Sequence, residues 1–206
     1  MNDFRPESLD APLDRRGALA RLAGVALSLT GITAFRRFTP DVARVRAPKW
    51  DDRFELAVDL EIAAQEGYRY HRPYVAVWVE DANGTPVRTL GVWVNTSGRG
   101  PRYFRELRRW FSMERDQQDA GGPDLIATVS SATRLPGQYT VTWNGRDDRG
   151  NVVDQGNYRV VIEAAREHGS YQLMQQDLPL GAKPVAADLG SNEEIGRARV
   201  EYRRRK

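Results

Sequence analysis

The stretch that decides the fold runs from residue 143 to residue 158 and reads Trp143-Asn144-Gly145-Arg146-Asp147-Asp148-Arg149-Gly150-Asn151-Val152-Val153-Asp154-Gln155-Gly156-Asn157-Tyr158. Apolar and aromatic segments, 139–143 and 158–164, flank its polar turn Asp147–Gly150, which predicts two strands joined as a hairpin. Gly156 marks a bulge or a sharp bend where the second strand starts. The stretch holds no nucleophile with a base, no metal cage and no phosphate loop. It therefore predicts an architecture and no reaction.

Strand patterns extend on both sides of this stretch. Residues 54–62 alternate apolar and mostly charged side chains, as in a half-buried strand. Segments 74–79 and 87–94 flank Asn83-Gly84, a dipeptide typical of hairpin turns. Weaker strands are predicted over 173–180, 185–189 and 195–202, for about eight in all. Short strands at this spacing, without alternating helices, predict an all-β, immunoglobulin-like β-sandwich.

One helix interrupts the strands. Between Pro101 and Met113, apolar residues recur at helical spacing with arginines opposite, which predicts a short amphipathic helix inserted in the sandwich. Polar residues 114–123, which include Gly121-Gly122-Pro123, predict a mobile loop after it. The arginines are Arg102, Arg105, Arg108 and Arg109. They form either a solvated helix face or a site for an anionic ligand such as a flavin phosphate.

Composition and charge limit the function classes. The 206 residues, 40% apolar and 29% charged, suit one soluble domain, and the absence of cysteine excludes disulfides and thiolate chemistry. The formal charge of +3 is uneven: residues 1–50 carry +4 and residues 203–206 another +4, which leaves −5 on 51–202. An acidic body repels phosphate backbones, so we expect no nucleic-acid partner.

The N-terminal region carries export signals. Arg15-Arg16 precede an uncharged run, 22–35, which is short for a membrane span and resembles a twin-arginine signal peptide. The run also resembles the end of a helix from PepSY-associated membrane proteins, and the arginines after it would hold that flank in the cytoplasm. A signal peptide and an uncleaved anchor, touching the membrane through 17–35, remain alternatives, as does a buried helix. The predicted organisation is 1–14 polar tail, 15–37 signal or anchor helix, 38–50 linker, 51–202 sandwich and 203–206 basic tail.

Neither the histidines nor the paired aspartates predict a metal site. His71 and His168 are the only histidines, and a zinc site would need both plus carboxylates such as Glu66 or Glu167. Their spacing favours positions at strand ends instead. Asp147-Asp148 lack the spacing of a calcium loop and favour turn formation.

Three segments carry a resemblance to a known family. Residues 70–81, the Ser131-Ala132-Thr133-Arg134-x-Pro136-Gly137 loop, and residues 163–169 together resemble the predicted periplasmic proteins of domain of unknown function 2271, across about 51–202. The 143–158 stretch is also similar to the immunoglobulin-like module of flagellar hook-capping proteins, which bears on the fold alone.

The family resemblance implies a candidate cofactor site. In the family the loop commonly reads Thr-Gly-Ala-Thr-Arg after an aspartate, similar to sequences where flavin transferases attach FMN to threonine. Thr133 would be the acceptor here, within Ser130, Ser131 and Ala132. Ser131 replaces the glycine and Ala127 the aspartate. The alternative is a polar turn over 130–137 capped by Pro136-Gly137.

The leading hypothesis is an exported, non-enzymatic binding or accessory module without a cofactor. It would be periplasmic, or anchored in the inner membrane, and would serve a membrane-associated redox or metal-handling system with a PepSY-type partner. The alternative is an electron-transfer protein with covalent FMN on Thr133. A hydrolase lacks a nucleophile, base and orienting group. The predicted ligand or partner surface comprises His71, Tyr74, Arg134, Arg105, Arg108, Arg109 and His168.

Overall fold

The computed structural model describes residues 47–65, 71–98, 100–167 and 169–205. Within these ranges, no helix has the length and apolar character needed to cross a membrane. The predicted signal or anchor segment, 15–37, lies outside the described residues, as does His168.

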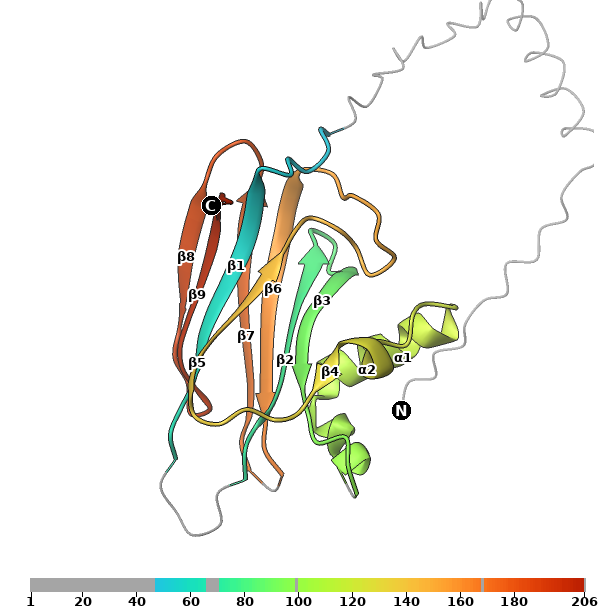
Figure 1. The fold of residues 1–206 in the computed structure, drawn as a ribbon, viewed down its shortest axis with the longest axis vertical. Helices are drawn as coiled ribbons and strands as arrows, with labels where there is room; N and C mark the ends of the chain where they lie inside the picture. The colour runs from blue at the N-terminus through green and yellow to red at the C-terminus, as the bar shows by residue number, and fades with distance from the viewer. Residues whose placement is uncertain (1–46, 66–70, 99, 168, 206) are drawn as a thin grey trace, which may run out of the picture. The chain divides into compact units, whose positions relative to one another are not determined.

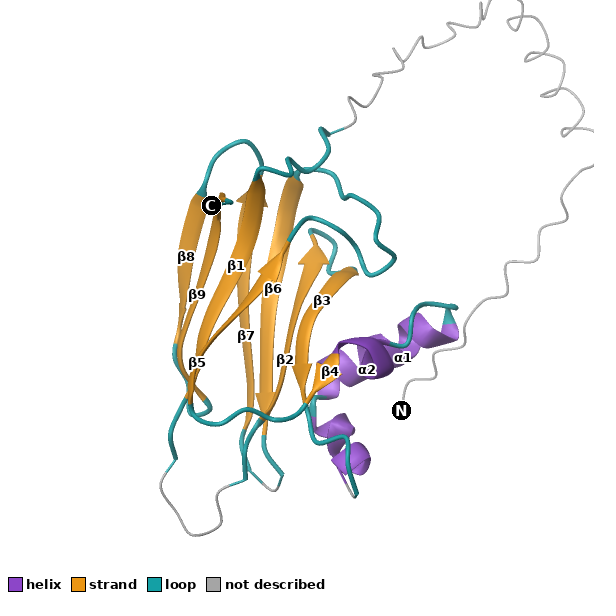
Figure 2. Ribbon diagram, in the orientation of Figure 1, coloured by secondary structure: helices purple, strands orange, loops and turns teal. Residues whose placement is uncertain are grey.

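Two β-sheets face each other, which confirms the predicted sandwich (Figures 1 and 2). One sheet has four strands in the order β5-β1-β9-β8, and the other has five in the order β4-β3-β2-β6-β7. All neighbouring strands are antiparallel except β3 and β4. The strands are β1 (Phe54–Ile62), β2 (Tyr74–Asp81), β3 (Pro86–Trp93), β4 (Ser130–Ser131), β5 (Gly137–Trp143), β6 (Gly156–Ala165), β7 (Tyr171–Leu180), β8 (Val185–Gly190) and β9 (Ile195–Arg204).

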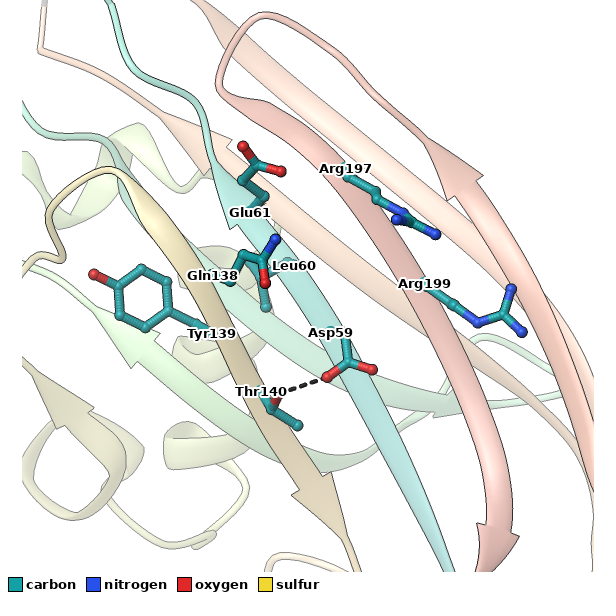
Figure 3. A pocket seen from close by; sticks show the side chains of 8 residues that line it. All are labelled: Asp59, Leu60, Glu61, Gln138, Tyr139, Thr140, Arg197 and Arg199. Carbon is teal, nitrogen blue, oxygen red and sulfur yellow. Dashed lines mark hydrogen bonds between the residues drawn. The ribbon is translucent and has the colours of Figure 1, made fainter.

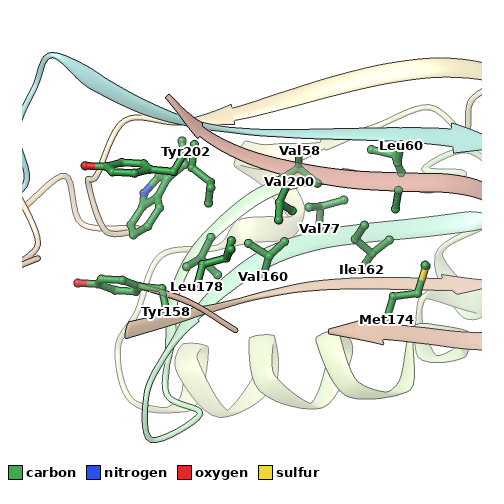
Figure 4. Close-up of a cluster of buried hydrophobic side chains, with 14 of the residues drawn as sticks. Val58, Leu60, Val77, Tyr158, Val160, Ile162, Met174, Leu178, Val200 and Tyr202 are labelled. Carbon is green, nitrogen blue, oxygen red and sulfur yellow. The ribbon is translucent and has the colours of Figure 1, made fainter. Parts of the chain in front are cut away.

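The main core lies between the two sheets (Figure 4). Val58 and Val200 come from the four-stranded sheet, and Val77, Val160 and Ile162 face them from the other sheet, each at most 1% exposed. Alternation along each strand directs every second side chain into this layer. The core therefore follows from the period-two pattern of the sequence.

A second core lies on the outer face of the five-stranded sheet. Three helices cover this face: the 3-10 helix η1 (Gly100–Glu106), α1 (Arg108–Asp119) and α2 (Leu125–Val129). Trp78 of β2 and Trp110 of α1 are both fully buried there. Consequently β2 is buried on both faces, since Val77 and Val79 point to one core and Trp78 to the other. This is why the run from Tyr74 to Val79 in β2 is apolar instead of alternating.

The helical insertion is longer than the sequence predicted. The helix expected over 101–113 is split into η1 and α1, and α1 continues to Asp119, so the prediction of a mobile loop over 114–123 is wrong for its first six residues. Glu114, which reads as a polar loop residue, is 1% exposed and accepts a hydrogen bond from Gln118 one turn later. A helical i, i+4 pair of this kind extends the helix beyond its aromatic stripe.

Residues 143–158 cross from one sheet to the other, and the predicted hairpin of 139–143 with 158–164 is wrong. β5 pairs with β1 in one sheet, whereas β6 pairs with β2 and β7 in the other. The polar turn itself is present: the Asp147 carboxylate accepts the backbone N–H groups of Arg149 (2.9 Å) and Asn151 (2.7 Å). This is the turn chemistry expected of aspartate.

An aromatic cluster explains why the crossing forms. Trp143 packs against Trp50 with ring centroids 4.7 Å apart and against Tyr158 at 5.2 Å, which links the two sheets. Gly145 adopts a φ of +74°, and a Cβ there would lie 2.1 Å from the Trp50 ring. Trp50 therefore belongs to the sandwich core although the sequence placed it in a linker, and the motif is a structural corner.

Candidate functional site

Five loops meet at one end of the sandwich, and we call this the loop end. The strand register places them together, because Ile62 of β1 lies beside Gly137 and Ile195, and Tyr74 of β2 lies beside Ala165. The described residues of the loop end are 63–65, 71–73, 94–98, 132–136, 166–167, 169–170 and 191–194. The three segments that carry the family resemblance, 70–81, 131–137 and 163–169, all reach this end.

A hollow of about 260 Å³ opens at the loop end. Its lining residues come from four separate segments: His71, Arg72, Tyr74, Asn95, Thr133 and Glu167. The structure thus brings together three of the predicted site residues, His71, Tyr74 and Thr133. Arg72 and Asn95 also line the hollow, and the sequence does not predict them there, because nothing in the local pattern shows which loop tips will meet.

The Tyr74–Glu167 hydrogen bond forms the floor of this hollow. The Tyr74 hydroxyl donates to Glu167 Oε1 at 2.6 Å, and Tyr74 is only 3% exposed. Burial, reinforced by this bond, raises the pKa of the Tyr74 phenol. The phenol therefore stays protonated and fixes the Glu167 carboxylate, while His71 and Arg72 remain exposed at the rim. The arrangement combines a buried, hydrogen-bonded pair with exposed donors.

The Thr133 segment is more structured than the predicted polar turn. Ser130 and Ser131 form β4, parallel to the end of β3, and the N–H of Val94 donates to the Ser131 carbonyl at 2.8 Å. The prediction of a turn over 130–137 is therefore wrong for Ser130 and Ser131, and for Gly137, which begins β5. Ala132 is exposed, and Thr133 is half-buried where it lines the hollow.

The two departures from the family pattern have structural counterparts. Ser131 lies in the strand pairing just described, so its backbone is held by the sheet. Ala127 lies in α2, and its N–H donates to the Asp124 carboxylate at 2.8 Å. Asp124 is the N-cap of α2, so the acidic group three residues before Ala127 serves the helix.

The predicted arginines have different partners. Arg109 donates to both oxygens of the buried Glu80, at 2.7 and 2.8 Å, and so fastens α1 to β2. Arg108 lies over the ring of Tyr171 at 4.7 Å, and Arg105 is exposed. Arg134 lies over the Trp93 ring at 5.5 Å, at the side of the loop end. None of these four lines the hollow.

A buried acidic residue near the loop end also escaped the sequence analysis. Glu194 is fully buried, pairs with Arg166 at 2.9 Å and accepts a hydrogen bond from Ser170. This cluster joins the loop before β9 to the loop between β6 and β7. Arg166 of this cluster directly precedes Glu167 of the hollow.

The polar groups at the loop end differ in whether another described residue partners them. Within the described ranges, no group of three or more His, Asp or Glu side chains is placed to hold a metal ion. The hydroxyl of Tyr74 is committed to Glu167, and the hydroxyl of Ser130 donates to the Ile126 carbonyl. The side chains of Thr133, His71 and Arg72 form no hydrogen bond with another described residue, and His71 and Arg72 are exposed.

Comparison with curated protein sequences and with solved structures finds no match. A family model described as "Predicted periplasmic protein (DUF2271)" matches residues 55–197, well over half of the chain, and these residues run from the start of β1 to the start of β9. The match includes all residues that line the hollow. The chain therefore belongs to the predicted periplasmic protein family DUF2271.

Proposed function

We propose that this protein is an exported, non-enzymatic binding module that engages its ligand or partner through the loop end. The observation that carries the proposal is the convergence of the three family-like segments on one hollow lined by His71, Tyr74 and Thr133. Loops held by a rigid sandwich are where binding residues concentrate. The family's description as periplasmic supports export.

The proposed setting is a membrane-associated redox or metal-handling system with a PepSY-type partner. The resemblance of 15–37 to a twin-arginine signal supports this setting, and an uncleaved segment 17–35 would keep the module at the inner membrane. The exposed His71 and Arg72 give the hollow donors for an acidic or anionic group on the partner. Glu167, held by Tyr74, gives it one fixed acceptor.

A second candidate function is a flavin carrier, favoured by the position of Thr133 in the hollow. A flavin transferase would join the Thr133 oxygen to the FMN phosphorus of a flavin dinucleotide. The bond between the two phosphates of the dinucleotide would break, the nucleoside monophosphate would leave, and the hydroxyl proton would pass to the transferase. Arg72 and His71 would then face the phosphodiester, and the bound flavin would supply electron transfer.

Protein recovered from its native envelope tests both candidates. The binding proposal predicts a colourless protein of unmodified mass in the periplasmic or inner-membrane fraction. It also predicts a partner cross-link that is lost in His71→Ala and kept in Ala186→Ser, a control on the exposed face of β8. Visible flavin absorbance, with one FMN on the peptide containing Thr133, would replace it with the second candidate. Protein confined to the cytoplasm would contradict both.

A further inference from the structure

The edge strand β5 differs from the other edges of the sandwich in the composition of the strand and in what lies beside it. β7 carries Pro179 and an Asp177–Arg159 ion pair, and β8 follows Lys183-Pro184. The edge of β3 is paired with β4, and α2 directly precedes β4 in the chain. Prolines, charges and covering elements of this kind prevent edge strands from pairing with other chains. β5 has no proline and no charged residue within the strand itself, although Pro136 directly precedes it and Arg134 lies over the Tyr139 ring at 5.8 Å.

β5 offers seven residues, Gly137–Trp143, that contain no charge and no proline. It pairs with β1 along its full length, and no second strand pairs with it within the described part of the chain. Leu135, two residues before the strand, is 58% exposed. An uncharged free edge beside an exposed apolar side chain matches the way extended segments add to a sheet.

Two carboxylates of β1 lie on the face beside this edge. Asp59 and Glu61 of β1 lie in register with Thr140 and Gln138 of β5, and together they line a hollow of about 240 Å³ (Figure 3). Asp59 accepts a hydrogen bond from Thr140 Oγ1 at 2.5 Å, but neither carboxylate forms an ion pair among the described residues.

The arginines of the same hollow extend away from these carboxylates. Arg197 and Arg199 of β9 are the register partners of Glu61 and Asp59, yet Figure 3 shows both side chains directed to the far side of β9. Arg199 pairs with Asp188 of β8 at 3.1 Å. The charged side chains nearest to the β5 edge on this face are therefore Asp59 and Glu61 of β1.

We propose that β5 is a docking edge for an extended segment of a partner protein that carries Lys or Arg at its outward-facing positions. The segment would pair with the β5 backbone. Its cations would reach across Thr140 and Gln138 to Asp59 and Glu61, since two strand spacings, about 10 Å, are within reach of a long basic side chain. This surface is separate from the hollow at the loop end, so the proposal stands whatever that hollow binds.

The test uses the full-length protein and two cyclised β-hairpin peptides as probes. One hairpin carries lysine, and the other glutamate, at alternate positions of its leading strand. Fluorescence anisotropy at low and at physiological salt measures affinity, and amide hydrogen exchange locates the contact. The lysine hairpin is expected to bind at least ten-fold more tightly than the glutamate hairpin and to slow exchange over 137–143.

Three variants separate edge pairing from charge attraction. Thr140→Lys should abolish binding, because it places a cation on the exposed face of β5, whereas the matched Ala186→Lys on β8 should bind like wild type. Asp59→Asn with Glu61→Gln should remove the preference for lysine while leaving the circular dichroism spectrum unchanged. This double variant keeps the test decisive if Thr140→Lys fails to fold.

Several outcomes would overturn the proposal. These are no binding of the lysine hairpin, equal affinity for the two hairpins, or protection at β8 or at the loop end instead of β5. Sedimentation that shows a dimer of the wild type, lost in Thr140→Lys, would assign the edge to a second copy of this chain and would equally overturn the proposed partner.

Discussion

Replacement of Arg109 by alanine should destabilise the protein far more than replacement of its neighbours. Glu80 is 2% exposed, and Arg109 donates to both of its oxygens; among the described residues, the only other hydrogen bond to that carboxylate comes from Trp78 Nε1 at 2.8 Å. Removal of Arg109 would leave a buried carboxylate without its counter-charge. Breaking a buried pair in this way costs about 3–5 kcal/mol.

The expected cost here is smaller, because the Arg109 side chain is 35% exposed and water screens part of the interaction. We therefore expect Arg109→Ala to lower the free energy of unfolding by about 2–3 kcal/mol. Arg108→Ala loses only the contact with the Tyr171 ring, worth about 0.5–1 kcal/mol at an exposed site. Arg105→Ala, at an exposed position, should stay within about 0.5 kcal/mol of wild type.

Urea denaturation of the three variants at neutral pH, followed by tryptophan fluorescence, measures these differences. The order of loss should be Arg109, then Arg108, then Arg105. A loss for Arg109→Ala no larger than that for Arg105→Ala would show that the arginines form one solvated face, and that the ion pair with Glu80 does not hold the helix on the sheet.

Three further predictions concern the turn, the corner and the buried acid. Asp147→Ala should cost about 1–2 kcal/mol in urea denaturation, since two backbone N–H groups lose their acceptor; an unchanged midpoint would contradict the turn assignment. Gly145→Ala should lower the free energy of unfolding by about 3 kcal/mol, because an alanine there has a positive φ and its Cβ overlaps the Trp50 ring. Gly84→Ala, which also has a positive φ but open space around its Cβ, should lower it by about 1 kcal/mol. Equal losses would contradict the packing of Gly145 against Trp50. Burial raises the pKa of Glu163, although the N–H groups of α1 that it accepts act in the opposite direction. The protonated side chain is therefore favoured in the folded state, and its contribution to the free energy of unfolding is complete below about pH 4.3, the unfolded pKa. This contribution declines as the pH rises through the raised pKa of the folded state. Glu163→Gln should remove that decline from the pH profile of unfolding, and an unaltered profile would contradict the burial effect.

Local elements of the fold could be predicted from the sequence because they depend on near neighbours. The alternation over 54–62 gave β1, and Asn83-Gly84 gave the β2–β3 hairpin, whose Gly84 has a φ of +81°. The partner of β5 could not be predicted in this way. Its pattern fits either sheet, and the choice depends on Trp143 packing against Trp50, almost a hundred residues earlier.

The attachment of the helices also depends on distant residues, although the sequence contains a signal for it. Glu163 lies in an otherwise apolar run and is fully buried, where it accepts the N–H groups of Arg109 (2.9 Å) and Trp110 (2.8 Å) at the start of α1. A single acidic residue within a buried strand indicates an acceptor for a helix N-terminus or a cation. Glu80 in β2 follows the same rule.

The candidate site could be predicted only in part. Thr133, His71 and Tyr74 were found from motifs, and the structure places all three around one hollow. Arg72 and Asn95 were missed, because loop residues carry no periodic pattern that links them to a distant partner. The arginines of α1 were predicted as part of the ligand or partner surface on charge alone, whereas Arg109 forms an ion pair with Glu80.

Amide hydrogen exchange of the protein in its native envelope extract, compared with the same protein after purification, tests the central claim most directly. If the loop end binds the natural ligand or partner, the extract should slow exchange around His71–Tyr74, Asn95, Thr133 and Glu167, and leave the opposite end near Gly84 and Gly150 unchanged. Protection at that opposite end, or identical exchange in the two samples, would contradict the account.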